Sequence, residues 1–378
     1  MKPPDRAIFS LWPQLADRVP WLELGELPTP LEPLERVEAA LGLPTGAGFI
    51  KRDDLTSPLY GGNKVRTLEV LLGEAQSKGA ARIVATGAFG SNHAVATLLH
   101  AQRIGLEAGA LLFPQPPSQA ALDNLLATLS ATAHATALPH WSALPLGLAA
   151  ARLRGAPGGG RVSVMVPGGA TPLGALGYVS AGIELARQVE RGLAPPEAGE
   201  IIVGVGSTCT SAGLLVGLHH AARAGVGWRR PPRLIAVRVT PWPITSAARI
   251  ARLAEATSRH LALLAGDPRL AIGYGALRAG LEVDRGFIGA GYGEATPSGL
   301  EAVEVFQSAM GLALDTTYSG KSAAALIARL RRRTPGPLIF WSTRSTAPLP
   351  LPTEADLDRA PRLMRWWIER ARRALAPR

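Results

Sequence analysis

The chain has 378 residues, of which 47% are hydrophobic and 18% charged, which is typical of a globular protein large enough for two lobes. Its single cysteine excludes an internal disulfide and a cysteine-based zinc site, and its seven histidines show no metal-ligand spacing, so we expect no metal. No stretch reaches the roughly 18 apolar residues of a membrane span. Charges and prolines fill residues 1–20, where a secretory signal would be apolar, so we expect a cytoplasmic protein with no membrane partner.

The formal net charge is +11, from 40 cationic and 29 acidic residues. A concentrated basic patch would suit a nucleic acid, because clustered cations release counterions from its phosphates. Here the arginines are scattered, and the densest runs, at 331–333 and 362–373, are short. We interpret these runs as solvated helix faces and expect no nucleic-acid partner, although the net charge favours small anionic ligands.

Apolar strands alternate with amphipathic helices along most of the chain. After a proline-rich start, the predicted strands are Gly48–Arg52, Arg82–Thr86, Ala108–Phe113, Val162–Val166, Ile201–Val205, Leu234–Val239 and Leu338–Trp341. The predicted helices are Leu31–Leu41, Asn63–Gln76, Asn92–Ile104, Ala175–Arg191, Thr210–Ala224 and a C-terminal amphipathic helix, Asp358–Leu375. Gly155–Gly160 reads as a surface loop. The alternation predicts an α/β fold with parallel sheets that carry helices on both faces.

Lys64 stands where a polar loop with two glycines becomes a helix, in the stretch YGGNKVR at 60–66. A Schiff-base lysine must be partly deprotonated, which burial or a cationic neighbour achieves. Gly61 and Gly62 would let the backbone approach a flat ring closely. Taken alone, a lysine at a helix start is more often an exposed surface residue.

A turn rich in glycine, serine and threonine links the strand Ile201–Val205 to the next helix. Free backbone N–H groups and hydroxyls at a helix N-terminus bind anions. The turn lacks the glycine spacing of a dinucleotide site and the lysine of a Walker loop, so a single phosphate fits it better; an ordinary tight turn is the alternative. The candidate phosphate-binding residues are Gly206, Ser207, Thr208, Cys209 and Thr210.

Two further groups of residues are candidates for substrate contact. Ser91, Asn92 and His93 follow a glycine-rich turn at a helix start, which suits a carboxylate but is also the place of an ordinary N-cap. Tyr292 lies between glycines, and Tyr318 precedes a Ser-Gly-Lys run. Tyrosines in such places either pack against their neighbours or carry protons near a substrate.

Together these motifs resemble the family of D-cysteine desulfhydrase and 1-aminocyclopropane-1-carboxylate deaminase, within the tryptophan-synthase-β-like pyridoxal-phosphate enzymes. The motifs that carry the resemblance, in family order, are DDLTxxxxGGNKxRxLE at 53–69, SNH at 91–93, PGGxxxxGALGY at 167–178, GYG at 291–293 and YSGK at 318–321. The resemblance implies two open, twisted, mainly parallel sheets, a homodimer, and pyridoxal 5'-phosphate in the cleft between a larger and a smaller domain. The expected domains are 1–66 plus 181–350 (larger), 67–180 (smaller) and a C-terminal helical extension at 351–378.

The resemblance also implies how the cofactor is held. Lys64 would form a Schiff base with it and would move the Cα proton of the substrate. Residues 206–210 would bind its phosphate, and Asn92 would hydrogen-bond its ring oxygen. Thr343 would meet the pyridine nitrogen, and Ser319 stands where a relative has a carboxylate for the same nitrogen.

For the substrate, the resemblance implies a small amino acid whose carboxylate meets Ser91, Asn92 and His93. Tyr292 and Tyr318 would flank the substrate as proton donors or acceptors. The expected catalytic residues are therefore Lys64, Ser91, Tyr292 and Tyr318.

Two departures from the family pattern bear on this site. Thr208 and Cys209 replace two glycines of the phosphate loop, and a positive φ at either position would cost about 1 kcal/mol or more. Arg344 and Ser345 replace two glycines after Thr343, which puts a cation near the ring and would suit an acidic substrate.

Within the family, His93 and Ser319 are similar to the desulfhydrase, since the deaminase typically has Gln and Glu at these places. A hydroxyl beside the pyridine nitrogen leaves it uncharged, which favours β-elimination. We therefore expect D-cysteine desulfhydrase-like breakdown to a 2-oxo acid and ammonia. The alternatives are deaminase-like ring opening and a relative that binds a ligand without catalysis; intact Lys64, Tyr292 and Tyr318 argue against the last.

Overall fold

The computed structural model describes residues 4–156, 159–242 and 244–376, which form two compact units. The larger unit comprises Met1–Ser57, Gly61–Val70 and Ala170–Thr346, and the smaller comprises Pro58–Tyr60, Leu71–Gly169 and Ala347–Arg378. The main segment of the smaller unit, Leu71–Gly169, is shorter at both ends than the expected segment 67–180. Residues 351–378, expected as a separate extension, belong to the smaller unit.

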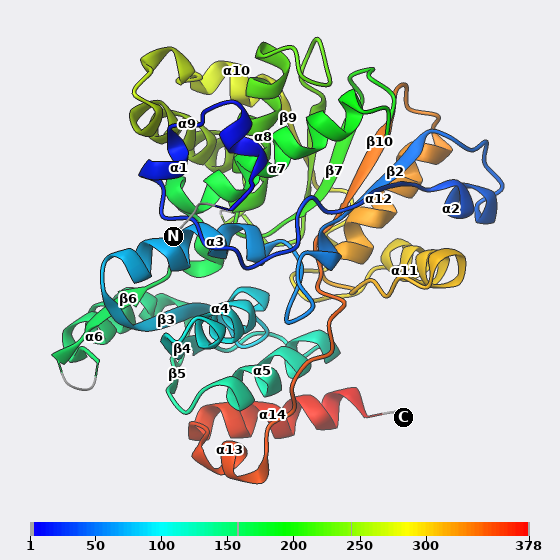
Figure 1. Cartoon of the computed structure of the whole chain (residues 1–378). Coiled ribbons are helices and arrows are strands. Elements are labelled where there is room, and N and C mark those ends of the chain that lie inside the picture. Colours follow the sequence, from blue (N-terminus) through cyan, green and yellow to red (C-terminus); the bar gives the residue numbers. More distant parts are fainter. Residues whose placement is uncertain (1–3, 157–158, 243, 377–378) are drawn as a thin grey trace. The chain divides into compact units, whose positions relative to one another are not determined.

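The larger unit is built on a sheet with the strand order β1-β2-β10-β7-β8-β9 (Figure 1). Its strands are β1 (Leu31–Pro33), β2 (Gly48–Arg52), β7 (Glu200–Val205), β8 (Arg233–Arg238), β9 (Leu281–Asp284) and β10 (Leu338–Ser342). Strand β1 is antiparallel to β2, and the other neighbours in this sheet are parallel. Strand β10, from near the end of the unit's sequence, lies between β2 and β7.

Helices cover both faces of this sheet. Side chains alternate along a strand, so Ile201, Val203 and Val205 of β7 enter one apolar cluster and Ile202 enters another. The helices of the larger unit are α1 (Leu15–Arg18), α2 (Glu35–Ala40), the start of α3 (Lys64–Ser77), α7 (Pro172–Glu190), α8 (Cys209–Arg223), α9 (Ala247–Ala265), α10 (Tyr274–Ala279), α11 (Pro297–Met310) and α12 (Ser319–Arg331). Residues of α7, α8 and α9 join the first cluster, and residues of α2, α11 and α12 join the second. Burial on both faces explains the continuous apolar runs of these strands.

The smaller unit has a parallel sheet with the order β5-β4-β3-β6. Its strands are β3 (Ala80–Ala88), β4 (Glu107–Phe113), β5 (Ala135–Ala137) and β6 (Arg161–Val164). Its helices are α4 (Asn92–Arg103), α5 (Gln119–Ala131), α6 (Leu144–Arg154), α13 (Glu354–Arg359) and α14 (Arg362–Leu375), besides the remainder of α3. In Figure 1 the red helix α14 lies along α5, and the two helices are in contact. Trp367 of α14 is buried, and its Nε1 donates to the carbonyl of Gln115 at 2.7 Å, whereas Trp366 is 48% exposed.

The α/β class with two mainly parallel sheets is confirmed, and two expected helices need correction. The segment expected as one helix over Leu31–Leu41 forms strand β1 followed by α2, because Pro33 has no N–H to donate inside a helix. The expected C-terminal helix is two helices, since Pro361 stands between α13 and α14. The loop expected at Gly155–Gly160 lies partly outside the described residues. No described helix combines the length and the hydrophobicity that crossing a membrane requires.

Candidate active site

Lys64 is the first residue of α3, and the loop before it is fastened to the chain just after β10. The backbone N–H of Asn63 donates to the carbonyl of Thr343 at 3.0 Å. Gly62 has φ +84°, and a Cβ on it would lie 2.6 Å from the same carbonyl oxygen. Only glycine fits such a contact. The second glycine of the GGNK motif, Gly62, is therefore required for this loop to approach residue 343 so closely.

The environment of Lys64 favours a neutral amine. Burial lowers the pKa of this lysine, and attraction to Cys209 opposes the shift only in part. The Nζ of Lys64 forms neither an ion pair nor a hydrogen bond within the described residues. The neutral amine is the form of lysine that attacks a carbonyl carbon, and a lowered pKa makes that form more accessible, so the environment of Lys64 suits Schiff-base formation.

The glycine-rich turn follows β7, and α8 begins at Cys209. The backbone N–H groups of Ser207, Thr208 and Thr210 donate no hydrogen bond within the described residues, which leaves them available to an anion at the helix N-terminus. The Oγ1 of Thr210 accepts from Nδ2 of Asn63 at 3.0 Å. The turn and the Lys64 loop are therefore in direct contact.

Thr208 adopts the left-handed conformation, with φ 74° and ψ −17°. The sequence raised this possibility for Thr208 and Cys209; the structure places the strain on Thr208, while Cys209 is already helical. A β-branched residue with positive φ is a true outlier. Its side chain is almost fully buried and forms no hydrogen bond that caps α8.

Tyr292 and Tyr318 form a hydroxyl pair against the same turn. Their Oη atoms are 2.9 Å apart, and their rings meet edge to face at 6.0 Å between centroids. A Cβ on Gly206 would lie 3.1 Å from Cε1 of Tyr318, so this ring packs on the glycine. Burial raises the pKa of both phenols, so both hydroxyls keep their protons near neutral pH.

Asp315 fixes the start of α12 and thereby Tyr318. Its carboxylate accepts the backbone N–H groups of Thr317, Tyr318 and Ser319, and the hydroxyl of Ser319 at 2.5 Å. The Ser319 hydroxyl also accepts from the backbone N–H of Asp315, so it is fully engaged. Contact of Ser319 with the cofactor stays a prediction, and the structure gives its hydroxyl a local partner instead.

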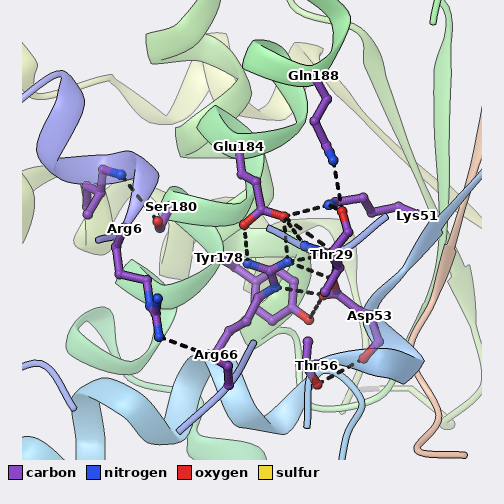
Figure 2. Close-up of polar contacts among 12 residues, drawn as sticks. Arg6, Thr29, Lys51, Asp53, Thr56, Arg66, Tyr178, Ser180, Glu184 and Gln188 are labelled. Atoms are coloured by element: carbon purple, nitrogen blue, oxygen red, sulfur yellow. Dashed lines mark hydrogen bonds and ion pairs between the residues drawn. The ribbon is translucent and has the colours of Figure 1, made fainter. Parts of the chain in front are cut away.

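A buried charge network that the sequence-based site did not include is formed around Arg66, two residues after Lys64 (Figure 2). Arg66 forms ion pairs with Asp53 at 2.8 Å and with Glu184 at 2.9 Å, and Lys51 pairs with Glu184 at 2.5 Å. Asp53 also accepts hydrogen bonds from Thr29, Tyr178 and Trp341, and its backbone carbonyl accepts from Gly62. The network thus braces the loop and strand β10 together.

The carboxylates of this network stay ionised. Burial would raise the pKa of Glu184, but Arg66 and Lys51 outweigh it and lower that pKa to about 2. The pKa of Asp53 is likewise lowered by Arg66 against the effect of burial. Asp53 and Arg66 belong to the 53–69 motif and could have indicated this network from the sequence. Glu184 could not, because it lies 118 residues after Arg66.

Ser91, Asn92 and His93 belong to the smaller unit, at the start of α4. Ser91 caps this helix by accepting from the N–H of Ala94 at 3.2 Å. The Oδ1 of Asn92 accepts from the hydroxyl of Tyr60 at 2.9 Å and from Nδ2 of Asn124 at 2.7 Å. These bonds orient the Asn92 amide. The structure therefore brings Lys64, the turn at 206–210, the tyrosine pair and Thr343 together, while the approach of residues 91–93 to them stays a prediction.

A family model described as "Pyridoxal-phosphate dependent enzyme" matches residues 22–340. The chain belongs to this family. Related curated proteins include the D-cysteine desulfhydrases of Salmonella newport (strain SL254) and Salmonella heidelberg (strain SL476), each 34% identical over 339 residues, which are 86% of this chain and 94% of the relative.

Solved structures agree with the family. One described as an ACC deaminase homologue matches with a TM-score of 0.72 and 27% identity, covering 91% of this chain and 96% of the other. The processed form of threonine deaminase isoform 2 from Solanum lycopersicum, 16% identical with a TM-score of 0.56, covers 90% of this chain and 85% of its own and shares the fold.

These comparisons confirm the expected family, fold and cofactor: this family member is a pyridoxal-phosphate-dependent enzyme of elimination or deamination. The residues of the larger unit fit the cofactor chemically. They offer an amine with a lowered pKa at Lys64 and, at the N-terminus of α8, N–H groups that have no partner among the residues that the structure describes. The roles of the individual residues stay predictions.

Proposed function

We propose that the enzyme removes the β-substituent of a small D-amino acid, with D-cysteine as the substrate. The Cα proton is removed, the C–S bond breaks, and the sulfur leaves with the electron pair as hydrogen sulfide. Water then converts the remaining unsaturated amine to a 2-oxo acid and ammonia. The D-cysteine desulfhydrases that are 34% identical over most of the chain support this substrate.

The observation that carries the proposal is the environment of Ser319. Four donors saturate Asp315, including the Ser319 hydroxyl, so this carboxylate is not available to a pyridine nitrogen. The Thr343 hydroxyl forms no hydrogen bond within the described residues and would serve as the partner of that nitrogen. A hydroxyl partner leaves the nitrogen uncharged, and elimination of a good leaving group tolerates the weaker electron sink.

When bound, the cofactor withdraws electrons from the Cα of the amino acid. Lys64, whose amine loses its proton more readily because burial lowers its pKa, takes the Cα proton. Tyr292 and Tyr318 keep their protons because burial raises the pKa of each, and one of them protonates the leaving sulfur. The N-terminus of α4, with Ser91, Asn92 and His93, binds the substrate carboxylate.

Ring opening of 1-aminocyclopropane-1-carboxylate is the second candidate, favoured by the solved ACC deaminase homologue with 27% identity. This reaction has no leaving group at Cβ and needs a stronger electron sink than a hydroxyl partner provides. We also propose that the larger unit holds most of the cofactor contacts and that the enzyme is a cytoplasmic homodimer.

A side-by-side assay tests the substrate. Purified enzyme is incubated with D-cysteine, L-cysteine, the sulfonate analogue of D-cysteine and the cyclopropane amino acid, and the release of 2-oxo acid and ammonia is measured. We expect D-cysteine to be consumed fastest. Faster turnover of the cyclopropane substrate than of every thiol or sulfonate would overturn the proposal, and yellow colour that borohydride removes checks independently that the cofactor is bound.

A further inference from the structure

Lys321 is a fully buried lysine in the first turn of α12, and the reaction outlined above does not use it. Its Nζ donates to the carbonyl of Ile288 at 2.7 Å and to the carbonyl of Gly291 at 3.2 Å. Both carbonyls belong to residues 285–293, which are part of the connection between β9 and α11 and form neither a helix nor a strand. The lysine therefore binds a segment that has no regular hydrogen-bond ladder of its own.

This contact buries an ammonium without a carboxylate beside it. No ion pair of Lys321 exists within the described residues, and burial lowers its pKa although Glu294 and Asp315 attract its charge. A buried cation is costly unless its donors are satisfied, and an ammonium has three of them. An apolar side chain of similar length, such as methionine, would avoid this cost but could not donate to the two carbonyls.

The segment held by Lys321 carries Tyr292, which follows Gly291 directly. Tyr318, the partner of Tyr292, is the N-cap of the helix that contains Lys321. One helical turn thus fixes both members of the hydroxyl pair, Tyr318 through the backbone and Tyr292 through the two carbonyl bonds. Glycines with positive φ at 289 and 293 flank the tyrosine, so few other constraints come from the segment itself.

We propose that Lys321 is a positioning residue that holds Tyr292 in hydrogen-bonding contact with Tyr318. This inference rests on the proposed function, because the tyrosine pair is the proton donor there. A small displacement of a catalytic group reduces turnover much more than substrate binding. Replacement of Lys321 should therefore lower kcat while KM and cofactor affinity change little.

The test compares Lys321→Met with a matched control, Lys78→Met, in the holoenzyme. Lys78 is exposed, directly follows α3, and forms an ion pair only with Glu74 of that helix among the described residues. We expect Lys321→Met to lower kcat by about 10- to 100-fold and the control to leave it unchanged. In a Tyr292→Phe background, the same Lys321→Met change should add less than about 3-fold, because the group that it positions is already gone.

Hydrogen–deuterium exchange gives a readout that does not depend on the substrate. We expect faster exchange in residues 285–293 of the Lys321→Met holoenzyme and unchanged exchange in β7. Equal losses of kcat in both backgrounds, or unchanged exchange in 285–293, would overturn the inference. Failure of the wild type to act on D-cysteine would contradict the proposed function alone, and the exchange result would still decide the role of Lys321. Lys321→Gln, which keeps an amide donor, replaces the Met variant if that variant does not fold, with the same outcomes expected at smaller size.

Discussion

Replacing Thr208 by glycine should stabilise the protein without its cofactor. A residue with a Cβ in the left-handed conformation costs about 1–2 kcal/mol, and Thr208 has φ 74°. Glycine removes this strain but loses about 0.5–1 kcal/mol through its greater freedom in the unfolded chain. The difference between these ranges is roughly 0–1.5 kcal/mol, so the free energy of unfolding of the apoprotein should rise by a value near the middle of that range.

The same change should weaken cofactor binding. The strained conformation persists although the Thr208 side chain forms no capping hydrogen bond, which points to a role of its hydroxyl at the phosphate. A hydrogen bond to a charged group contributes roughly 1.5–3 kcal/mol. Its loss corresponds to a Kd for pyridoxal phosphate that is roughly 10- to 100-fold higher.

The assay combines urea unfolding of the apoprotein with fluorescence titration of the cofactor. Thr208→Ala is the matched control, because alanine keeps the Cβ and hence the strain but lacks the hydroxyl. We expect the glycine variant to be more stable than the alanine variant and both to bind the cofactor weakly. A glycine apoprotein less stable than the alanine one would refute the strain argument, and wild-type affinity in both variants would refute the phosphate contact.

Three further predictions concern the Lys64 loop and its support. Lys64→Ala should give protein without the yellow colour and without turnover; wild-type absorbance in this variant would contradict the assignment. Gly62→Ala should lower the free energy of unfolding by clearly more than Gly79→Ala, because both glycines have positive φ but only at Gly62 would the Cβ meet backbone, 2.6 Å from the Thr343 carbonyl; equal losses in urea unfolding would sink this argument. Glu184, with its pKa lowered from 4.5 to about 2, should contribute roughly 3 kcal/mol above pH 4.5 that is lost as the pH falls to 2; a pH-independent stability between these values would show that the pair with Arg66 is not maintained.

Hydrophobic periodicity was enough to predict many of the strands and helices around the site, but α12 and α11 were not predicted. Strand β2 has the predicted bounds, Gly48–Arg52, and α8 begins one residue before the predicted start. These elements are long, apolar and regularly spaced, so local pattern and tertiary burial agree. The N-terminal strand β1 was missed because a three-residue strand next to a proline carries almost no periodic signal.

The site was predictable where one short motif forms one local structure. The GGNK loop, the turn at Gly206 and the N-cap of α4 are of this kind. The buried pairing of Arg66 with Glu184 spans 118 residues of sequence, so no local pattern could indicate it. The hydrogen bond from the Ser319 hydroxyl to Asp315 was equally unpredictable, because it depends on the turn before α12 and not on the YSGK motif.

The interleaving of the two units has a consequence for synthesis on the ribosome. Strand β10 pairs with both β2 and β7, so the larger sheet stays split into two incomplete halves until residue 342 has emerged. The smaller unit is completed later still, because it needs Trp367 of α14, which packs against Phe89 and donates to the carbonyl of Gln115. Neither unit can therefore complete its native packing before these late segments have emerged, and until then the nascent polypeptide exposes unpaired strand edges.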